Sequence, residues 1–374
     1  MDQPVVLGIV SYKVFPAQMG GQKYIVDYYT ELSRHIKIVL AVSKDNQVDK
    51  YANYKTHPIL FNHWYGWLNM VHVYRLCQII RKEKVNVIMV DHSYFGWLGM
   101  LLKKITGKKL SIKSANIETL RFRDMHRVGW RTYGKYEGWV HRHADINFFI
   151  STEEKQWAIS KWNLIPATCA TLPYGTKTIR PVSREERLNS RRFILKETNL
   201  SPNTKLFFFN GTLDYLPNTD ALYVIVQELL HRMEASHIPF CIFICGSNIS
   251  EAWAQVLHKT PHIIYKGFVP DINRYYQGTD CLICPVTLGT GVKTKLVEAL
   301  AQGQPVIACK RSGTGLNATE LGKQLILVND YDWNTFAEAM LNLDIHEPTR
   351  TPDSFYAKYN WPAIVEESIL SLQR

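Results

Sequence analysis

The chain has 374 residues, of which 46% are hydrophobic and 21% are charged, a composition that excludes a disordered or fibrous protein. Its length predicts two domains of roughly 150 to 200 residues, and its formal net charge of +11 indicates an anionic partner such as a nucleotide, a phosphorylated lipid, an acidic membrane surface or a nucleic acid. The N-terminus has no basic signal-peptide region, and no run reaches the roughly 20 apolar residues of a spanning helix. We therefore expect a cytoplasmic protein.

The first half of the chain alternates between strand and helix patterns. Apolar strand patterns occur in VVLGIVSY, IKIVLAVS, VNVIMVD and KLSIKSA, and helical patterns lie between them at 22–34, 71–82 and 96–104. Alternation of this kind predicts βαβ units that form a parallel sheet.

The second half repeats this alternation after a charged segment at 176–204, which predicts a hinge near 175–181 followed by a helix. Strand patterns occur in KLFFFNG, PFCIFICG, HIIYKG, DCLICPV and PVIACK, with helices expected at 221–234 and 362–372. The sequence therefore predicts a first domain at 1–178 and a second at 179–354. Because ligands of open α/β sheets bind outside the carboxyl ends of the strands, we expect the functional residues in loops that point into a cleft between the domains.

The cysteines raise the question of a metal site. Cys281 and Cys284 form a CxxC pair, and Cys241 and Cys245 lie in another apolar run. A strand places residues i and i+3 on opposite faces, whereas structural zinc pairs usually lie in turns. We interpret these cysteines as reduced thiols buried in the core.

The sequence GTGVKT at 289–294 follows a strand pattern and precedes a helical pattern. A glycine-rich turn at a helix N-terminus offers free backbone N–H groups and a favourable dipole to an anion. The Walker A motif places its lysine directly after a glycine, and the dinucleotide fingerprint needs a third glycine where Thr294 stands, so neither motif fits. A tight turn that binds no ligand is the alternative.

Two lysines and a glutamate extend this loop. Lys293 and Lys295 lie in the expected first helical turn, which is unfavourable for cations unless a bound polyanion compensates them. The lysines could hold a diphosphate, and Glu298 could accept hydrogen bonds from ribose hydroxyls. The alternative is a salt bridge between Lys295 and Glu298, which would contribute only a few tenths of a kcal/mol.

The pattern GxGxKxKxxE, read from Gly289 to Glu298, resembles the donor-site signature of one subgroup of the retaining GT-B glycosyltransferases of glycosyltransferase family four (group 1). The stretches FFFNGTLDYLPNTDAL, IIYKGFVPDINRYYQGTDCLICPV and PVIACKRSGTGL resemble the same family in the same order. The first half resembles it more weakly, for example through Gly20-Gly21, Asp91 and Asn116-Ile117-Glu118.

This resemblance implies an α/β protein of the GT-B fold, with two Rossmann-like domains that face each other across a cleft and a C-terminal helix within 355–374 that crosses back to the first domain. It implies a hexosyltransferase that moves a sugar from a UDP or GDP sugar to an acceptor hydroxyl with retained configuration. The acceptor would be a glycan or lipid-linked glycan of cell-surface polysaccharide synthesis. The nucleotide sugar is a co-substrate, and no other cofactor and no essential metal are expected.

The resemblance also implies the functional residues. We expect catalytic roles for Lys293, Lys295, Glu118 and Asn116, and for His92, which ends a strand pattern and could supply an imidazole. The expected donor contacts are Gly20, Gly21, Asn210, Gly211, Thr212, Asp214, Gly267, Phe268, Val269, Gly289, Thr290, Gly291, Val292, Leu296 and Glu298. Asp330 and Asp332 spell a DxD metal motif, but Asp332 is better explained as the N-cap of a following helix.

Two positions depart from the family pattern. Thr290 stands where relatives have a glutamate that contacts the transferred sugar, and Ala115 stands where they often have a histidine. These departures keep open a noncatalytic protein that binds sugar nucleotides or glycans. A second alternative is another GT-B sugar-nucleotide enzyme, such as an epimerase that needs no external acceptor.

Basic and aromatic residues alternate at 121–143 (RFRDMHRVGWRTYGKYEGWVHRH). This pattern favours contact with an acceptor or with anionic lipid at the inner face of the cell membrane. A solvated helix face is the alternative, and nucleic acid is an unlikely partner because the family resemblance points to glycans.

Overall fold

The computed structural model describes residues 3–17, 19–47, 52–345 and 350–374. The chain divides into two compact units, of which unit 1 comprises Met1–Gly175 and Trp361–Arg374 and unit 2 comprises Thr176–Asn360. These divisions fall close to the expected ones at 178 and 354, but residues 355–360, which we expected with the first domain, lie in unit 2.

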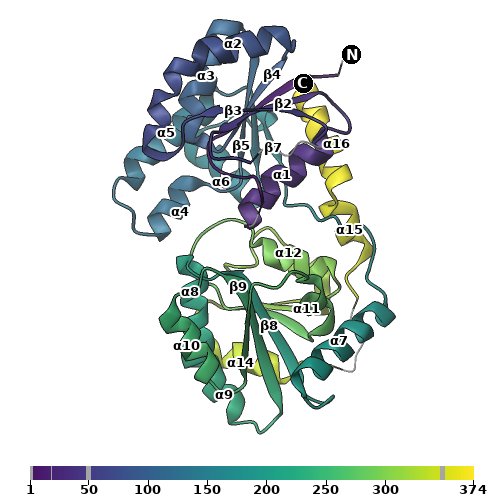
Figure 1. Cartoon of the computed structure of the whole chain (residues 1–374). Coiled ribbons are helices and arrows are strands. Elements are labelled where there is room, and N and C mark those ends of the chain that lie inside the picture. The colour runs from purple at the N-terminus through teal and green to yellow at the C-terminus, as the bar shows by residue number, and fades with distance from the viewer. Residues whose placement is uncertain (1–2, 18, 48–51, 346–349) are drawn as a thin grey trace. The chain divides into compact units, whose positions relative to one another are not determined.

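Unit 1 is built on a parallel sheet of seven strands in the order β3-β2-β1-β4-β5-β6-β7. Figure 1 shows α2, α3 and α5 on one side of this sheet and α1 beside α16 on the other. Because helices cover both faces, β1, β2 and β4 are buried along their whole length, which explains their nearly continuous apolar sequences. The strands are β1 Val6–Val10, β2 Ile38–Ser43, β3 Lys55–Leu60, β4 Val87–Asp91, β5 Lys109–Ser114, β6 Ile146–Phe149 and β7 Cys169–Thr171.

The helices of unit 1 include one from the far end of the chain. The α-helices are α1 Gly20–Leu32, α2 Val73–Lys82, α3 Gly96–Thr106, α4 Glu118–Asp124, α5 Trp130–His143, α6 Thr152–Trp162 and α16 Trp361–Gln373, and the 3₁₀ segments are η1 His63–His72, η2 Ser93–Phe95 and η3 Pro166–Thr168. The α16 helix packs against α1, so the expected return of the C-terminal helix to the first domain is found within this unit.

Unit 2 contains a second parallel sheet, of six strands in the order β10-β9-β8-β11-β12-β13. The strands are β8 Lys205–Thr212, β9 Phe240–Ser247, β10 Ile263–Gly267, β11 Cys281–Cys284, β12 Val306–Cys309 and β13 Leu325–Val328. The helical segments are α7 Arg184–Thr198, α8 Leu216–Tyr223, the π-helix η4 Val224–Leu229, α9 Leu230–Glu234, α10 Glu251–Lys259, α11 Asn273–Gly278, α12 Thr294–Ala301, α13 Ala318–Leu321, the 3₁₀ segment η5 Gly322–Gln324, α14 Trp333–Leu341 and α15 Asp353–Tyr359. The α8, α9 and α10 helices lie on one side of this sheet, opposite α7 and α11 (Figure 1).

Several local predictions are confirmed. Cys241, Cys245, Cys281 and Cys284 are free thiols buried in the sheet of unit 2. The Asp332 side chain caps α14 by accepting a hydrogen bond from the Thr335 N–H at 3.1 Å. The expected α/β class with two parallel sheets is found as well.

Other elements differ from the expectation. The helix expected at 221–234 begins earlier, at Leu216, and passes through a π-helical segment before it ends at Glu234. The sequence analysis also missed β3, because its exposed edge position leaves it only two buried residues, at its C-terminal end. A strand with so little buried surface lacks the apolar pattern from which strands are predicted.

Candidate functional site

The two most specific predicted segments meet at one edge of the sheet in unit 2. Counted from β8, the strand order runs to β9 and β10 in one direction and to β11, β12 and β13 in the other. Ligands of such sheets bind outside the carboxyl ends of the strands at this reversal point. Residues 210–218 run from the end of β8 into the start of α8, and residues 289–298 follow β11, so the fold brings both segments to that point.

The loop after β11 depends on glycine. Gly289 and Gly291 have φ angles of 76° and 82°, which other residues rarely adopt. A Cβ at Gly289 would lie 3.5 Å from Pro217 Cγ and 3.7 Å from Lys293 Nζ. The loop therefore fits closely between the start of α8 and the side chain of Lys293.

Lys293 is the N-cap residue of α12. Its Nζ donates hydrogen bonds to the carbonyl oxygens of Gly289 and Thr290, each at 3.2 Å. The Oγ1 atom of Thr290 is buried and has no hydrogen-bond partner within the described parts of the chain. An ammonium group and a helix N-terminus thus lie together at this loop, an arrangement suited to a phosphate group.

Lys295 is only 9% exposed. Its Nζ donates to Asn218 Oδ1 at 2.9 Å and lies 4.2 Å from the centre of the Phe209 ring. Burial lowers the pKa of Lys295, although the charge of the nearby Glu298 acts in the opposite direction. A bound anion would offset the cost of burying this ammonium.

Glu298 lies in the middle of α12 and belongs to a short chain of hydrogen bonds, the relay. Tyr276 donates its hydroxyl hydrogen to Glu298 Oε2 at 3.0 Å and accepts a hydrogen bond from Asn210 Nδ2 at 2.8 Å. The relay joins a residue of β8 to a residue of α12 through the buried side chain of Tyr276. It fixes the orientation of the Glu298 carboxylate, which suits the predicted contact with a ribose.

The remaining predicted donor contacts in unit 2 divide into accessible and buried positions. Phe268 is 75% exposed directly after β10, and Gly267 beside it has a φ of 65°. Asp214 is exposed, and Gly211, Thr212, Val269 and Val292 are half-buried. Leu296 is an exception, because its side chain has no exposed surface and its N–H donates to the Lys293 carbonyl. The side chain of Leu296 therefore belongs to the core.

Unit 1 has its own reversal point, between β1 and β4, and His92 lies there. His92 directly follows β4 and has backbone angles of φ 61° and ψ 161°, a region that only glycine visits freely. Its Nδ1 lies 3.3 Å from Glu118 Oε1, and its Nε2 lies 3.3 Å from the hydroxyl of Tyr12, which follows β1. The surrounding fold holds this strained residue in contact with a carboxylate and a phenol.

Glu118 begins α4 and has no exposed side-chain surface. It accepts a hydrogen bond from the Tyr94 hydroxyl at 2.6 Å and one from Arg121 Nη1 at 3.1 Å. Burial disfavours the charged form of Glu118, but the adjacent imidazole of His92 and the charge of Arg121 outweigh it, so that the pKa of Glu118 lies below the ordinary value. The carboxylate is therefore ionised at neutral pH and can orient the imidazole.

Three further predicted residues belong to unit 1. They are Gly20, Gly21 and Asn116. Gly20 and Gly21 form the first turn of α1, and a Cβ at Gly21 would lie 3.9 Å from the Tyr12 hydroxyl oxygen. Asn116 is half-buried in the turn between β5 and α4. The glycine pair therefore lies beside the phenol that contacts His92.

Sequence reasoning missed the tyrosines that connect these groups. Tyr12, Tyr94 and Tyr276 each bring a hydroxyl to a predicted site residue. Burial raises the pKa of each of these phenols, so they stay protonated and can donate. Tyr12 and Tyr94 stand close to the ends of strand patterns, which could have marked them, whereas Tyr276 lies in a helix with no local signal.

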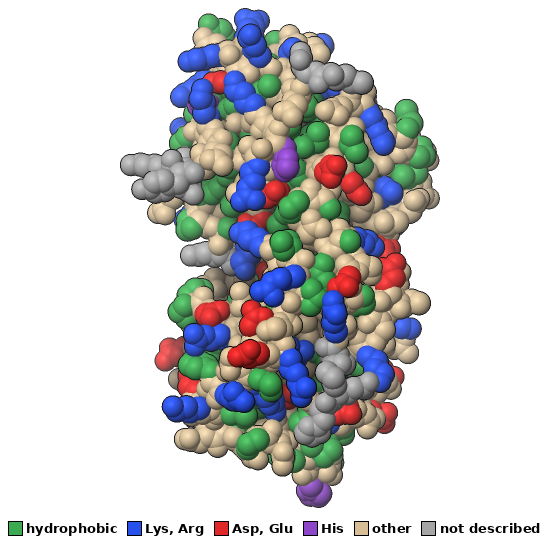
Figure 2. Space-filling view, turned by 90° about the vertical axis from the view of Figure 1, so that its right-hand side faces the viewer, with side chains coloured by type: hydrophobic (Ala, Val, Ile, Leu, Met, Phe, Trp, Pro, Cys, Tyr) green, Lys and Arg blue, Asp and Glu red, His purple; other side chains and the backbone are tan. Residues whose placement is uncertain are grey.

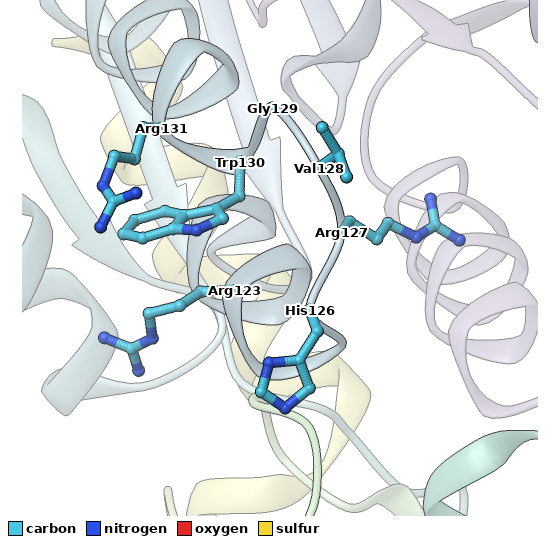
Figure 3. A pocket seen from close by; sticks show the side chains of 7 residues that line it. All are labelled: Arg123, His126, Arg127, Val128, Gly129, Trp130 and Arg131. Atoms are coloured by element: carbon cyan, nitrogen blue, oxygen red, sulfur yellow. The ribbon is translucent and has the colours of Figure 1, made fainter.

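The basic and aromatic stretch forms an elbow between α4 and α5. A cavity of about 470 Å³ is lined here by Arg123, His126, Arg127, Val128, Gly129, Trp130 and Arg131. In Figure 3 the Trp130 ring lies between the side chains of Arg123 and Arg131, and Arg127 points to the other side of the elbow. The elbow thus exposes three guanidinium groups, of which that of Arg131 lies 4.7 Å from the Trp130 ring centre and that of Arg127 lies 5.0 Å from the Phe122 ring centre.

Charge by itself does not mark a site on the face of the molecule shown in Figure 2. On the face shown in Figure 2, Lys and Arg side chains are interspersed with acidic and hydrophobic ones. Within the described residues, no group of three His, Cys, Asp or Glu side chains is placed to hold a metal ion. No helix of that same part of the chain is long and apolar enough to cross a membrane.

Residues 204–344 match the family model described as "Glycosyl transferases group 1". No curated protein matches the chain.

Solved structures of low sequence identity share the fold. Sucrose-phosphate synthase from Thermosynechococcus elongatus is 16% identical with a TM-score of 0.74, and the match covers 97% of each chain. HepE from Anabaena, solved with UDP, is 13% identical with a TM-score of 0.74 over 99% of each chain, and it was also solved with UDP-glucose. WaaG, a glycosyltransferase involved in lipopolysaccharide biosynthesis, is 13% identical with a TM-score of 0.64, and covers 97% of this chain and 98% of its own. The chain therefore has the GT-B fold, and its residues 204–344 match the model of the group 1 glycosyltransferases.

Proposed function

We propose that the chain transfers a hexosyl group from a nucleoside diphosphate sugar to an acceptor hydroxyl with retention of configuration. One observation carries this proposal: Lys293 and Lys295 lie at the N-terminus of α12, at the reversal point of the sheet in unit 2. The complex of HepE with UDP-glucose supports a UDP sugar as the first donor to test.

The chemistry follows from the charge that develops during transfer. As the glycosidic bond to phosphate breaks, negative charge grows on the diphosphate, and prepositioned cations and N–H donors stabilise it. Lys293 and Lys295 take this role, Glu298 holds the ribose, and the exposed ring of Phe268 packs on the base. The acceptor attacks from the leaving-group face, and its proton passes to the departing phosphate. His92 and Glu118 orient polar groups of the reactants.

The test begins with the donor. Thermal shifts with UDP, GDP, ADP and their sugars identify the nucleotide that stabilises the protein, and product analysis with the best donor then detects transfer. We expect Lys293→Ala and Lys295→Met to lower turnover by about 100- to 1,000-fold, because removing one such donor typically costs about 3 to 4 kcal/mol of barrier. Methionine at 295 keeps the buried apolar stem and removes only the charge.

Lys259→Ala is the matched control. Lys259 is an exposed lysine at the C-terminal end of α10, away from the carboxyl edge of the sheet, so its turnover should equal that of the wild type. Normal turnover in both site variants would refute the proposed role of the lysines. Epimerised sugar with donor alone would instead support an epimerase, and donor binding without transfer or hydrolysis would support a noncatalytic binding protein.

We also propose that unit 1 contacts anionic lipid through the elbow between α4 and α5, as expected for an enzyme whose acceptor is a lipid-linked glycan. Val128 is fully exposed at its tip, and Arg127 and Arg131 are exposed beside it. Apolar and basic groups of this kind bind the interface of anionic membranes.

Cosedimentation with vesicles tests this contact. Each basic residue contributes about 1 kcal/mol near an anionic surface, so the double variant Arg127→Ala/Arg131→Ala should bind phosphatidylglycerol vesicles roughly 30-fold more weakly. Arg192→Ala removes an exposed charge from α7 of unit 2 and should have little effect. Equal binding to phosphatidylcholine vesicles, or unchanged binding of the double variant, would contradict the proposal.

A further inference from the structure

Glu137 is a buried acid that the proposed chemistry does not use. It lies on α5, has no exposed surface, and accepts hydrogen bonds from two backbone N–H groups and two hydroxyls. The N–H of Glu118 donates to its Oε1 at 3.0 Å, and the N–H and hydroxyl of Thr119 donate to its Oε2 at 2.8 and 2.5 Å. The Ser93 hydroxyl donates to Oε1 at 3.1 Å.

These four donors come from two separate segments that carry predicted catalytic residues. Glu118 and Thr119 form the first turn of α4, so the carboxylate of Glu137 caps the helix that presents Glu118. Ser93 begins η2 and is bonded directly to His92, whose backbone lies in a strained region. One carboxylate therefore connects the turn after β4 to the start of α4, and so determines the separation of His92 from Glu118.

We propose that Glu137 is a positioning residue that holds His92 and Glu118 in their contact and does so only while its carboxylate is ionised. This inference rests on the proposed function, since it concerns the residues assigned to orient the reactants. An ionised carboxylate only accepts hydrogen bonds, and all four of its partners are donors. A protonated Glu137 would direct its own O–H at one of these donors and lose that contact.

The surroundings of Glu137 place its titration near neutral pH. Burial raises the pKa of Glu137 to about 7, the hydrogen bonds from Thr119 act in the opposite direction, and the charge of Glu118 raises it further. The other titratable or charged groups around it are Tyr94 from η2, Tyr133 and Tyr136 from α5, and the Glu118 partners His92 and Arg121. The phenols stay protonated in this range because burial raises their pKa values. Activity should therefore fall as the pH is lowered through about 7.

Glu137→Gln tests the proposal in the full-length chain. The amide keeps the shape of the side chain but presents one acceptor and one donor group. We expect kcat to fall by roughly 10- to 100-fold, the usual effect of a small displacement of catalytic groups. The KM for the donor should change little, because all the predicted donor contacts except Gly20 and Gly21 lie in unit 2. We also expect the acid limb of the kcat profile between pH 6 and 8 to disappear.

A second readout does not depend on activity. Hydrogen exchange of the backbone in α4 should be slow in the wild type above pH 7 and faster in Glu137→Gln, because one of the two oxygens that accept the N–H groups of α4 is replaced by an NH₂ group. Ser93→Ala removes only the hydrogen bond from the Ser93 hydroxyl to Glu137. It is the second variant to test if Glu137→Gln does not fold. It should lower kcat less and leave exchange in α4 nearly unchanged.

The outcomes separate the two proposals. If transfer is detected and depends on Lys293, but Glu137→Gln keeps the kcat and pH profile of the wild type, the positioning role is wrong and the proposed function stands. If no donor supports transfer, the proposed function fails, and exchange in α4 still decides whether Glu137 holds Glu118. Unchanged exchange in Glu137→Gln would overturn the inference.

Discussion

At the scale of single residues, the core of unit 1 contains a buried charged side chain, that of Lys113. Its side chain is fully buried, and its Nζ lies 2.6 Å from Asp91 Oδ1. The rings of Tyr24, Tyr28 and Tyr29 lie 4.5 to 4.9 Å from this ammonium, and Tyr29 also donates to Asp91 Oδ2 at 2.7 Å. Burial lowers the pKa of Lys113 in spite of the opposite charge beside it.

Breaking this pair should be costly. Asp91→Asn leaves the Lys113 ammonium buried without a counter-charge, so we expect the free energy of unfolding to fall by about 3 to 5 kcal/mol. Urea denaturation measures this change. The matched control is Asp353→Asn, whose partner Arg350 lies 2.7 Å away but where both side chains are mostly exposed; this change should cost less than about 1 kcal/mol. Similar losses in both variants would show that the Lys113 pair has no special role.

At the scale of elements, the loop between β11 and α12 determines where the predicted diphosphate contacts lie. Its glycines allow the chain to turn sharply after a buried strand and to begin a helix whose N-cap is Lys293. The same turn brings α12 alongside the start of α8, through the hydrogen bond between Lys295 and Asn218. The conformation of this loop therefore sets the geometry of both lysines.

Gly289→Ala tests this dependence. The residue has a φ of 76°, so alanine adds roughly 1 to 2 kcal/mol of backbone strain, and its methyl group would lie 3.7 Å from Lys293 Nζ. We expect weaker donor binding, measured by titration calorimetry with the donor that the thermal-shift screen selects.

Gly107→Ala provides the control for backbone strain alone. Gly107 has a φ of 67° at the C-terminal end of α3, and a Cβ there would meet no atom within 4 Å. This variant should lose a similar amount of stability and keep its donor affinity. Equal affinity of Gly289→Ala and the wild type would contradict the role of the loop.

At the scale of the whole molecule, unit 1 contains two separate segments of the chain, and the sequence of unit 2 lies between them. Trp361 begins α16 and packs against Tyr24, Tyr28 and Tyr174, with ring centres 6.0 to 6.4 Å apart. Gly175 allows this approach, because a Cβ there would lie 2.5 Å from the Trp361 ring. The last residues of the chain are therefore part of the core of the first unit.

Trp361→Ala should destabilise unit 1 by about 3 to 5 kcal/mol, the usual cost of removing a buried tryptophan. Hydrogen exchange should accelerate in 3–175 and remain unchanged in 176–345. Phe336→Ala, which removes a fully buried aromatic ring from α14 in unit 2, should give the opposite pattern. Faster exchange in unit 2 for Trp361→Ala would show that the two units do not respond separately.

The sequence alone determined the architecture and predicted an anion site in the segment 289–298. Apolar strand runs alternating with amphipathic helices leave few arrangements other than parallel sheets covered on both faces, and the glycines and lysines of GTGVKT carry a local signal for an anion. Tertiary structure decided which side chains meet. Local pattern could not show that Lys295 is buried against Asn218, that Leu296 belongs to the core, or that Tyr276 links Asn210 to Glu298. Nor could it show that Glu137 joins Ser93 to Glu118. Those contacts join residues far apart in the chain, and they exist because the order of the strands, rather than any local sequence, sets which loops become neighbours.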